Sequence, residues 1–198
     1  MADEVEDESF LSDDWYGEDL ADRAYTRCFF TNVDLTETTS QGAVFTECVF
    51  GNVKLNASRH TDSAFLRCTF DRCNLFEAEF TGCKLVGSTF TNCSLRPMRV
   101  TDGDWSFVNL AGADLRGVTV RGARMREADL SGADCTGAVL AGVDLSGARL
   151  RGVKLGRADL RGSDLTALDP VAAAELRGAL IDAEQAVVIA QALGLEIR

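Results

Sequence analysis

The sequence predicts an all-β solenoid, in which short strands wind coil after coil around a single core. Every fifth residue from Leu20 to Leu165 is nearly always large and apolar, and this register runs without a slip. A second column, mostly Cys, Ala, Val or Ser, lies two positions before each large residue. Neither an α-helix nor an ordinary strand buries a strict period of five, whereas solenoids are built from short regular repeats.

The repeat also predicts which side chains face inward. In extended backbone, the large residue and the small residue two positions earlier point to the same side, so both are expected in the core. The other three positions are expected to face solvent. Gly often follows two positions after the large residue, as at Gly42, Gly112 and Gly142. This recurrence fits a backbone that turns once in every repeat.

Several repeats resemble the pentapeptide-repeat family, whose pattern is A(D/N)LXX. The matching segments are ADLRG (113–117), ADLSG (128–132), VDLSG (143–147) and ADLRG (158–162). The resemblance implies a right-handed, quadrilateral β-helix with four pentapeptides in each coil.

A coil of twenty residues sorts the large residues into four columns, which we name by their early members. The Phe30 column continues with Phe50, Phe70 and Phe90, and the Tyr25 and Leu35 columns are similarly regular. The Leu20 column is the exception, because its next members are Ser40 and His60. Two interpretations stay open for this column: a local hydrogen-bonded irregularity or bulge, and a face specialised for contact with a partner.

Charge and composition suggest three regions: an acidic, flexible segment over 1–17, the β-helix over 18–167, and a C-terminal cap and dimerisation segment over 168–198. Residues 1–22 hold ten acidic side chains and no basic one, whereas the remainder has 21 acidic and 20 basic residues. The acidic segment is read either as a solvated terminus or as a binding feature. The near balance of the remainder gives no positive patch for direct binding of nucleic acid.

The segment after Leu165 predicts helices. Asp169 followed by Pro170 is typical of a helix start, and Asp182 with Gln185 three positions later resembles a capping box. The second helix is apolar over more than half of its circumference, so one side can cover the end of the solenoid while the other contacts a second copy. The candidate dimer-interface residues are Val187, Val188, Ile189 and Leu193. Capping without dimerisation is the alternative.

The residues give no support for an enzyme. The single histidine, His60, falls at an interior position, and the seven cysteines lack metal-ligand spacing. No phosphate-binding loop or nucleophile pattern occurs. We therefore expect no catalytic residue, cofactor or bound metal. An apolar run of about 18 residues is absent, as is a secretory signal, and the many cysteines suit a reducing compartment. We expect a cytoplasmic protein without a membrane segment.

Within the family, the chain is most similar to the fluoroquinolone-resistance branch, which comprises MfpA-like and Qnr-like proteins, and especially to the MfpA type. The similarity lies in NASRHTDSAFLRCTF (56–70), CSLRP (93–97) and the terminal segment DP…DAEQAVVIAQALGL (169–195). It implies a dimeric rod, joined through its C-terminal ends, that mimics B-form DNA and binds DNA gyrase, a type II topoisomerase. Such proteins inhibit the enzyme or protect it from quinolones.

The Leu20 face is the most acidic of the four faces by a small margin. It supplies the candidate partner-binding residues Asp62, Glu79, Asp102 and Asp159. Two rods end to end would span roughly 70 Å, or about 20 base pairs. The alternative function is an interaction scaffold whose partner is not gyrase. Whether binding inhibits or protects gyrase is open.

Overall fold

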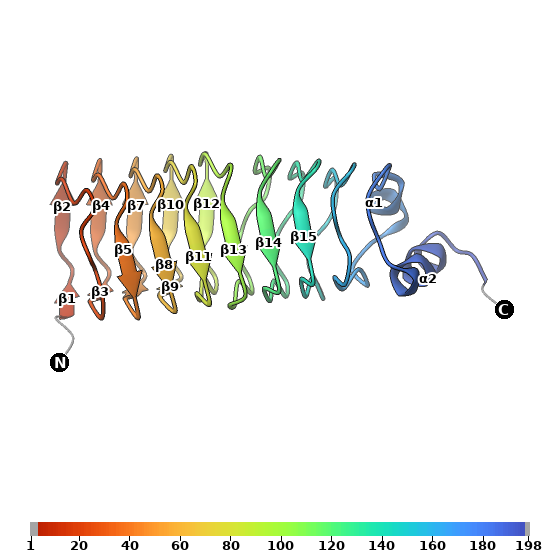
Figure 1. Cartoon of the computed structure of the whole chain (residues 1–198), viewed down its shortest axis with the longest axis horizontal. Coiled ribbons are helices and arrows are strands. Elements are labelled where there is room, and N and C mark those ends of the chain that lie inside the picture. Colours follow the sequence, from red (N-terminus) through yellow and green to blue (C-terminus); the bar gives the residue numbers. More distant parts are fainter. Residues whose placement is uncertain (1–3, 197–198) are drawn as a thin grey trace.

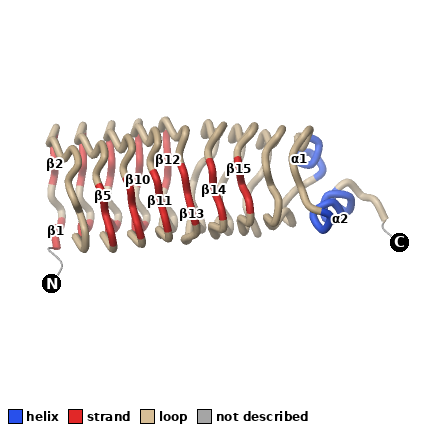
Figure 2. The backbone as a smooth tube through the Cα atoms, in the orientation of Figure 1, coloured by secondary structure: helices blue, strands red, loops and turns tan. Residues whose placement is uncertain are grey.

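The computed structural model describes residues 4–196, which form one elongated rod with the two chain ends at opposite ends of it (Figure 1). Three-residue strands stack along the rod as parallel sheets on three of its sides. Two short helices lie at the C-terminal end (Figure 2). The all-β solenoid predicted from the period of five is confirmed.

Each of three sides carries one sheet. The Tyr25 face contains β1 (Glu4–Glu6), β3 (Ala24–Thr26), β6 (Val44–Thr46) and β9 (Ala64–Leu66). The Phe30 face contains β2 (Ser9–Leu11), β4 (Phe29–Thr31), β7 (Val49–Gly51), β10 (Thr69–Asp71) and β12 (Thr89–Thr91). The Leu20 face contains β5 (Thr39–Gln41), β8 (Arg59–Thr61), β11 (Glu79–Thr81), β13 (Arg99–Thr101), β14 (Thr119–Arg121) and β15 (Val139–Ala141).

The fourth side, the Leu35 face, is held by isolated parallel bridges such as Asp34 with Lys54. On all sides the pairing joins residues that are twenty apart, as in Glu4 with Ala24, so the coil length is confirmed. Ring centroids of Phe50 and Phe70 are 4.7 Å apart and nearly parallel. This distance matches the spacing of hydrogen-bonded strands, so stacked side chains follow the backbone lattice.

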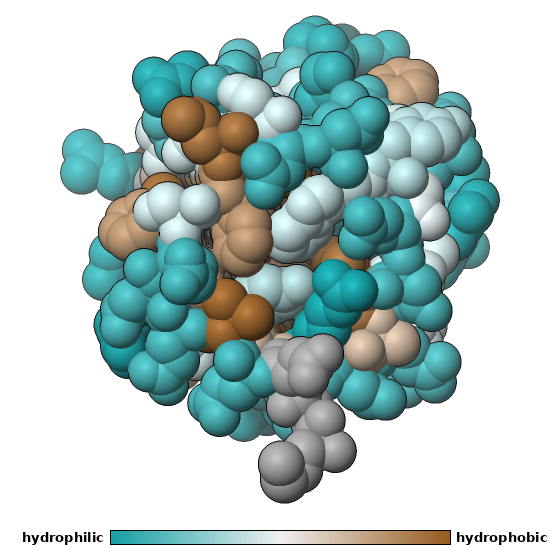
Figure 3. Space-filling view, turned by 90° about the vertical axis from the view of Figure 1, so that its left-hand side faces the viewer, coloured by the Kyte–Doolittle hydropathy of each residue, from teal (hydrophilic) through white to brown (hydrophobic). Residues whose placement is uncertain are grey.

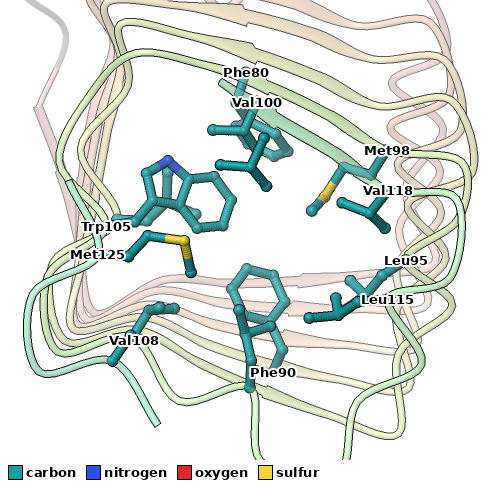
Figure 4. Close-up of a cluster of buried hydrophobic side chains, with 14 of the residues drawn as sticks. Phe80, Phe90, Leu95, Met98, Val100, Trp105, Val108, Leu115, Val118 and Met125 are labelled. Carbon is teal, nitrogen blue, oxygen red and sulfur yellow. The ribbon is translucent and has the colours of Figure 1, made fainter. Parts of the chain in front are cut away.

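Side chains from all four sides fill the interior. They come from the two inward positions of each repeat, the large residue and the small residue two positions before it. Figure 4 shows one such layer, in which Trp105, Phe90, Leu95 and Val100 point toward one another from different sides. Six of the seven cysteines lie in the small column, where their thiols reach backbone carbonyls of the preceding coil, whereas Cys135 takes the place of a large residue in the Leu35 column. Cys73 Sγ, for example, lies 3.1 Å from the carbonyl oxygen of Phe50. All seven are free thiols, so their place is explained by packing.

The corners explain the recurring glycines. At nearly every corner the residue two positions after the large residue has a positive φ, whether it is a glycine such as Gly112 (φ 69°) or another residue such as Asn32 (φ 57°). At many corners the turn is closed by a backbone hydrogen bond, as from Thr38 N–H to the Leu35 carbonyl (3.3 Å). Glycine adopts this conformation without steric strain.

The expected flexible segment over 1–17 is wrong for residues 4–17, and residues 1–3 lie outside the described part of the chain. Strand β1 pairs with β3, β2 pairs with β4, and Asp14 forms a bridge with Asp34, so residues 4–17 belong to the β-helix. The physical reason is that Val5, Phe10 and Trp15 continue the five-residue register and pack against the core. The acidic residues occupy outward positions of a folded coil.

The C-terminal helices begin as the sequence predicts. Helix α1 (Pro170–Ala174) is capped by Asp169, and α2 (Ala183–Ala192) is capped by Asp182 with a complete capping box. The buried Gln185 side chain donates hydrogen bonds to the carbonyl oxygens of Leu160 (2.5 Å) and Ser163 (2.8 Å). These bonds fasten α2 to the last coil and satisfy carbonyl groups at the end of the solenoid.

Two glycines allow a matched test of how closely adjacent coils approach each other. A Cβ at Gly103 would overlap the carbonyl oxygen of Cys83, whereas a Cβ at Gly112 would have nothing within 4 Å, although both residues have positive φ. We expect Gly112→Ala to lower the free energy of unfolding by about 1–2 kcal/mol, which is the cost of the left-handed conformation. Gly103→Ala should cost at least about 2 kcal/mol more because the coils must separate. Urea denaturation of both variants measures the difference, and equal losses would contradict the close approach of the coils.

Candidate functional site

Two of the four candidate partner-binding residues are exposed and unpaired carboxylates. Asp62 and Asp102 follow β8 and β13 at the corner between the Leu20 and Tyr25 faces, and both are exposed. The ion pairs on this face among the described residues involve other acids. Both carboxylates are therefore available to a partner.

Asp22, Asp62 and Asp102 form a row along this corner, which we call the aspartate column. In the coil that follows each aspartate, the same position is a glycine: Gly42, Gly82 and Gly122. A Cβ at any of these glycines would come too close to the Oδ1 atom of the preceding aspartate. The carboxylates therefore lie over glycine, two coils or about 9.6 Å apart. Asp62 and Asp102 are predicted from the sequence as partner-binding candidates, whereas the alternation with glycine that aligns them is evident only in the stacked coils.

The other two candidates are neutralised by arginines. Glu79 lies between Arg59 and Arg99, with nitrogen–oxygen distances of 3.6 and 3.7 Å. Asp159 accepts two hydrogen bonds from the Arg161 guanidinium, at 2.7 and 2.8 Å. The Arg161 hydrogen bonds lower the pKa of the Asp159 carboxyl below its ordinary value. The Asp159 side chain is only 13% exposed, so it is a weaker candidate for direct contact than Asp62.

The first coil is the most acidic part of the described chain. Nine carboxylates and no basic residue lie between Glu4 and Asp22, and we call this segment the acidic coil. Its neighbouring coil compensates part of the charge, since Arg27 contacts Glu6 (3.1 Å) and Asp7 (2.7 Å). The hydrogen bond from Arg27 lowers the pKa of the Asp7 carboxyl. An excess of negative charge therefore lies on a folded element.

The candidate dimer residues divide into two pairs. Val187 and Leu193 on and after α2 are 41% and 50% exposed. Val188 and Ile189 are partly buried and pack against the core, so they contribute to capping. Two further apolar side chains, Leu180 and Leu195, are 55% and 60% exposed at the same end of the rod. The cap thus leaves apolar surface open to solvent, which is a common property of interaction sites.

The irregular Leu20 column contains a buried hydrogen-bonded chain. The Ser40 hydroxyl lies 2.8 Å from His60 Nδ1, and His60 Nε2 lies 3.1 Å from the Ser58 hydroxyl. The His60 ring stacks on Phe80, with centroids 4.9 Å apart. Burial lowers the pKa of His60 to about 4. Of the two interpretations, a local hydrogen-bonded irregularity accounts for Ser40 and His60, and the strands continue through it without a bulge.

No group of three His, Cys, Asp or Glu side chains among residues 4–196 is placed to hold a metal ion. In the same range, no helix has the length and apolar character needed to cross a membrane. The chemistry that this surface offers is recognition through carboxylates, arginines and exposed apolar side chains.

Comparison with known proteins identifies the repeat. The pentapeptide-repeat region model matches residues 43–120, and the pentapeptide-repeats model matches eight copies over residues 128–166. The chain is therefore a pentapeptide-repeat protein. No curated protein matches the sequence.

Among solved structures, the chain is similar to a trypsin-treated variant of QnrB1, a plasmid-mediated fluoroquinolone resistance protein. The TM-score is 0.91 at 23% identity, over 100% of this chain and 99% of that chain. Full-length QnrB1 gives a TM-score of 0.72 at 21% identity, over 97% and 100% of the two chains. The match over the whole chain supports the all-β solenoid fold. A particular closeness to the MfpA type is not found.

The buried histidine predicts a pH-dependent stability. Because the pKa of His60 falls from an ordinary 6.5 to about 4 on folding, the unfolded chain binds more protons between these values. The contribution of neutral His60 is complete above about pH 6.5 and is lost as the pH falls toward 4. At about pH 4.5 we expect a loss of roughly 2.5 kcal/mol in the free energy of unfolding.

His60→Asn, which cannot ionise in this range, is the matched variant. Urea denaturation at about pH 7 and about pH 4.5 should show that its loss is smaller than that of the native protein by this amount. An equal loss in both proteins would show that other groups control the acid sensitivity.

Proposed function

We propose that this protein binds DNA gyrase as a DNA-mimicking dimer in the cytoplasm, and thereby modulates or inhibits the enzyme and protects it from quinolone-type poisons. It acts by binding and not by catalysis. The main support is that the similarity to the fluoroquinolone resistance protein QnrB1 extends over the whole chain, including the C-terminal cap. The sequence segments 56–70 and 169–195 support the same assignment through their resemblance to that branch.

The shape is compatible with this proposal. Residues 4–165 wind at about 4.8 Å per coil, so one rod is about 40 Å long. Two rods joined through their C-terminal ends would extend about 80 Å, comparable to roughly 23 base pairs of DNA. The exposed side chains of Leu180, Val187, Leu193 and Leu195 favour this end as the interface.

The charge restricts how such mimicry would work. Because acidic and basic residues nearly balance after residue 22, the rod is not uniformly negative. The unpaired aspartate column supplies a line of negative charge along one corner, and the acidic coils would lie at the two far ends of the dimer. We infer that gyrase is contacted mainly through the aspartate column, with Asp62 and Asp102 as the principal contacts.

A scaffold for a partner other than gyrase is the second candidate. The near neutrality of the rod favours the scaffold function, because a neutral surface has little electrostatic attraction to the positively charged DNA-binding surface of a topoisomerase. A supercoiling assay with purified gyrase, with and without a quinolone, distinguishes the two. If the protein neither affects supercoiling nor rescues the poisoned enzyme, the gyrase proposal is wrong.

The aspartate column gives a sharper test. We expect the double variant Asp62→Asn and Asp102→Asn to weaken the effect on gyrase about tenfold, because two unpaired charges are lost. The double variant Glu79→Gln and Asp159→Asn changes the net charge equally but removes carboxylates that arginines already neutralise. It should have a smaller effect in the same titration. Equal effects of the two variants would indicate that only total charge matters.

The dimer is tested separately. Leu193→Asp should convert a dimer into a monomer in light scattering at micromolar concentration, because a charge would be buried in an apolar interface. Phe107→Asp is the control, since Phe107 is 56% exposed on the side of the rod, away from the cap. A native protein that is already monomeric, or a dimer insensitive to Leu193→Asp, would refute this interface.

A further inference from the structure

The hydrogen-bond ladder of the Leu35 face is interrupted between two adjacent coils. On this face, backbone N–H groups donate to carbonyls of the preceding coil, as Ser94 does to Cys73 (2.9 Å). The equivalent bond one coil later, from Asp114 N–H to the Cys93 carbonyl, is not formed. The Arg96 guanidinium spans the interruption and lies 3.2 Å from the Asp114 carboxylate. We call this interruption between the Cys93 and Asp114 coils the coil gap.

The coil gap opens a hollow at the surface of the rod. In the part of the chain that the structure describes, no backbone hydrogen bond joins residues 92–97 to residues 112–117. The hollow has a volume of about 540 Å³, and its lining includes Cys93, with Gly112 and Ala113 from the next coil. All seven cysteines are described, and Cys93 is the one that is not buried. Its sulfur is therefore the thiol that a small solute can reach first.

A second thiol lies beside Cys93, one coil earlier in the same column. Cys73 Sγ is 3.1 Å from the Phe50 carbonyl, and Cys93 Sγ is 3.3 Å from the Phe70 carbonyl, so the two side chains occupy equivalent places. Adjacent coils are separated by about 4.8 Å, which falls within the Cα spacing of disulfides, about 4.4–6.8 Å. The backbone spacing therefore allows a bond between the two sulfurs.

The two thiols differ in reactivity. The Cys73 thiol donates a hydrogen bond to the Cys93 sulfur, which lowers the pKa of Cys93 and raises the pKa of Cys73. The thiolate is the reactive form of cysteine, so the more accessible thiol is also the more nucleophilic one. Once the Cys93 sulfur is bound in a disulfide, it no longer holds the Cys73 proton as a thiolate does. Cys73 is thus suited to react second.

Cys48 and Cys68 provide a comparison within the same rod. They also stack in adjacent coils, and a hydrogen bond from Cys68 lowers the pKa of Cys48. Here the ladder is intact, since Thr69 N–H donates to the Cys48 carbonyl (2.9 Å), and the two side chains are 0% and 1% exposed. Figure 3, a view onto the N-terminal end, shows apolar side chains at the centre of the rod with hydrophilic ones around them. Access, and not the thiol pair alone, distinguishes Cys73 and Cys93.

We propose that Cys93 and Cys73 form a redox-active thiol pair that reacts with a low-molecular-weight disulfide entering the coil gap. The Cys93 thiolate attacks one sulfur of the small disulfide, and the first small thiolate leaves. The Cys73 thiolate then attacks the Cys93 sulfur and displaces the second small thiolate. One internal disulfide and two small thiols result, and the two protein thiol protons pass to the leaving thiolates. This modification does not depend on the gyrase proposal.

The first test maps the disulfide in the native chain. The folded protein is treated with oxidised glutathione at about pH 8, the remaining thiols are alkylated, and the unreduced protein is digested with trypsin. Cys93 then lies in the peptide 85–99, and Cys73 lies with Cys83 in the peptide 73–84, so fragmentation must assign the linked cysteine. We expect a bond between Cys73 and Cys93 and five alkylated cysteines. A lasting glutathione adduct on Cys93 without this bond would overturn the proposal, as would an equal yield of a Cys48–Cys68 bond.

Serine variants separate the two steps. Cys73→Ser should stop the reaction at the mixed disulfide and retain glutathione on Cys93. Cys93→Ser should slow the oxidation of Cys73 by at least about tenfold, because the accessible nucleophile is lost. Cys48→Ser, the same substitution at a stacked but buried thiol, should leave the rate unchanged. Equal rates in Cys93→Ser and the native protein would contradict the proposed order of attack.

Denaturation shows whether the fold controls the reaction. In urea the coil gap is lost and all seven thiols are exposed, so oxidised glutathione should give mixed products without preference for Cys73 and Cys93. If the folded and unfolded chains gave the same distribution of products, the coil gap would have no part in the selectivity and the proposal would be wrong. The pairing is read from the native protein, so this comparison does not depend on how well a variant folds.

Discussion

The structure depends on backbone hydrogen bonds between adjacent coils, which set residues that lie twenty apart side by side. These bonds place every residue directly over its counterpart in the next coil, at the spacing of neighbouring strands. The aromatic columns follow from this constraint, since Phe30, Phe50, Phe70 and Phe90 stack with successive centroid distances of 4.8, 4.7 and 4.6 Å. So does the preference for small inward residues, whose side chains must fit beside a carbonyl of the preceding coil. A close approach of coils also explains Gly103, because any Cβ there would meet the backbone of Cys83.

The same lattice determines how surface charge is balanced. An acid at one position meets the residue twenty later, and where that residue is basic the two form an ion pair, as Asp104 does with Arg124 at 2.9 Å. Exposed pairs of this kind add little stability, about 0–1 kcal/mol each. Their larger effect is to cancel the field of the rod over most of its length. Carboxylates remain free where the lattice offers no base, as at Asp62 and Asp102, which lie over glycine.

The period of five is sufficient to predict the solenoid, its inward columns and its turning corners, because every repeat has its inward residues and its turn at the same positions. The first coil was missed although Val5, Phe10 and Trp15 continue the register, because its acidic composition resembles that of a flexible terminus. The pairing of Glu79 and Asp159 with arginines could not be derived, since outward positions tolerate most residues and their partners depend on side-chain geometry. Likewise, the apolar stripe of α2 did not reveal that Val188 and Ile189 face the core while Val187 and Leu193 face solvent.

A uniform repeat gives few positions at which one surface differs from another, so recognition must use the places where the pattern is incomplete. Three such places are the corner where aspartates alternate with glycines, the cap where Leu193 and Leu195 stay exposed, and the first coil, which has nine acids and no base between Glu4 and Asp22. The cap carries exposed apolar side chains and the first coil carries negative charge, so the two ends of the rod offer chemically different surfaces for recognition.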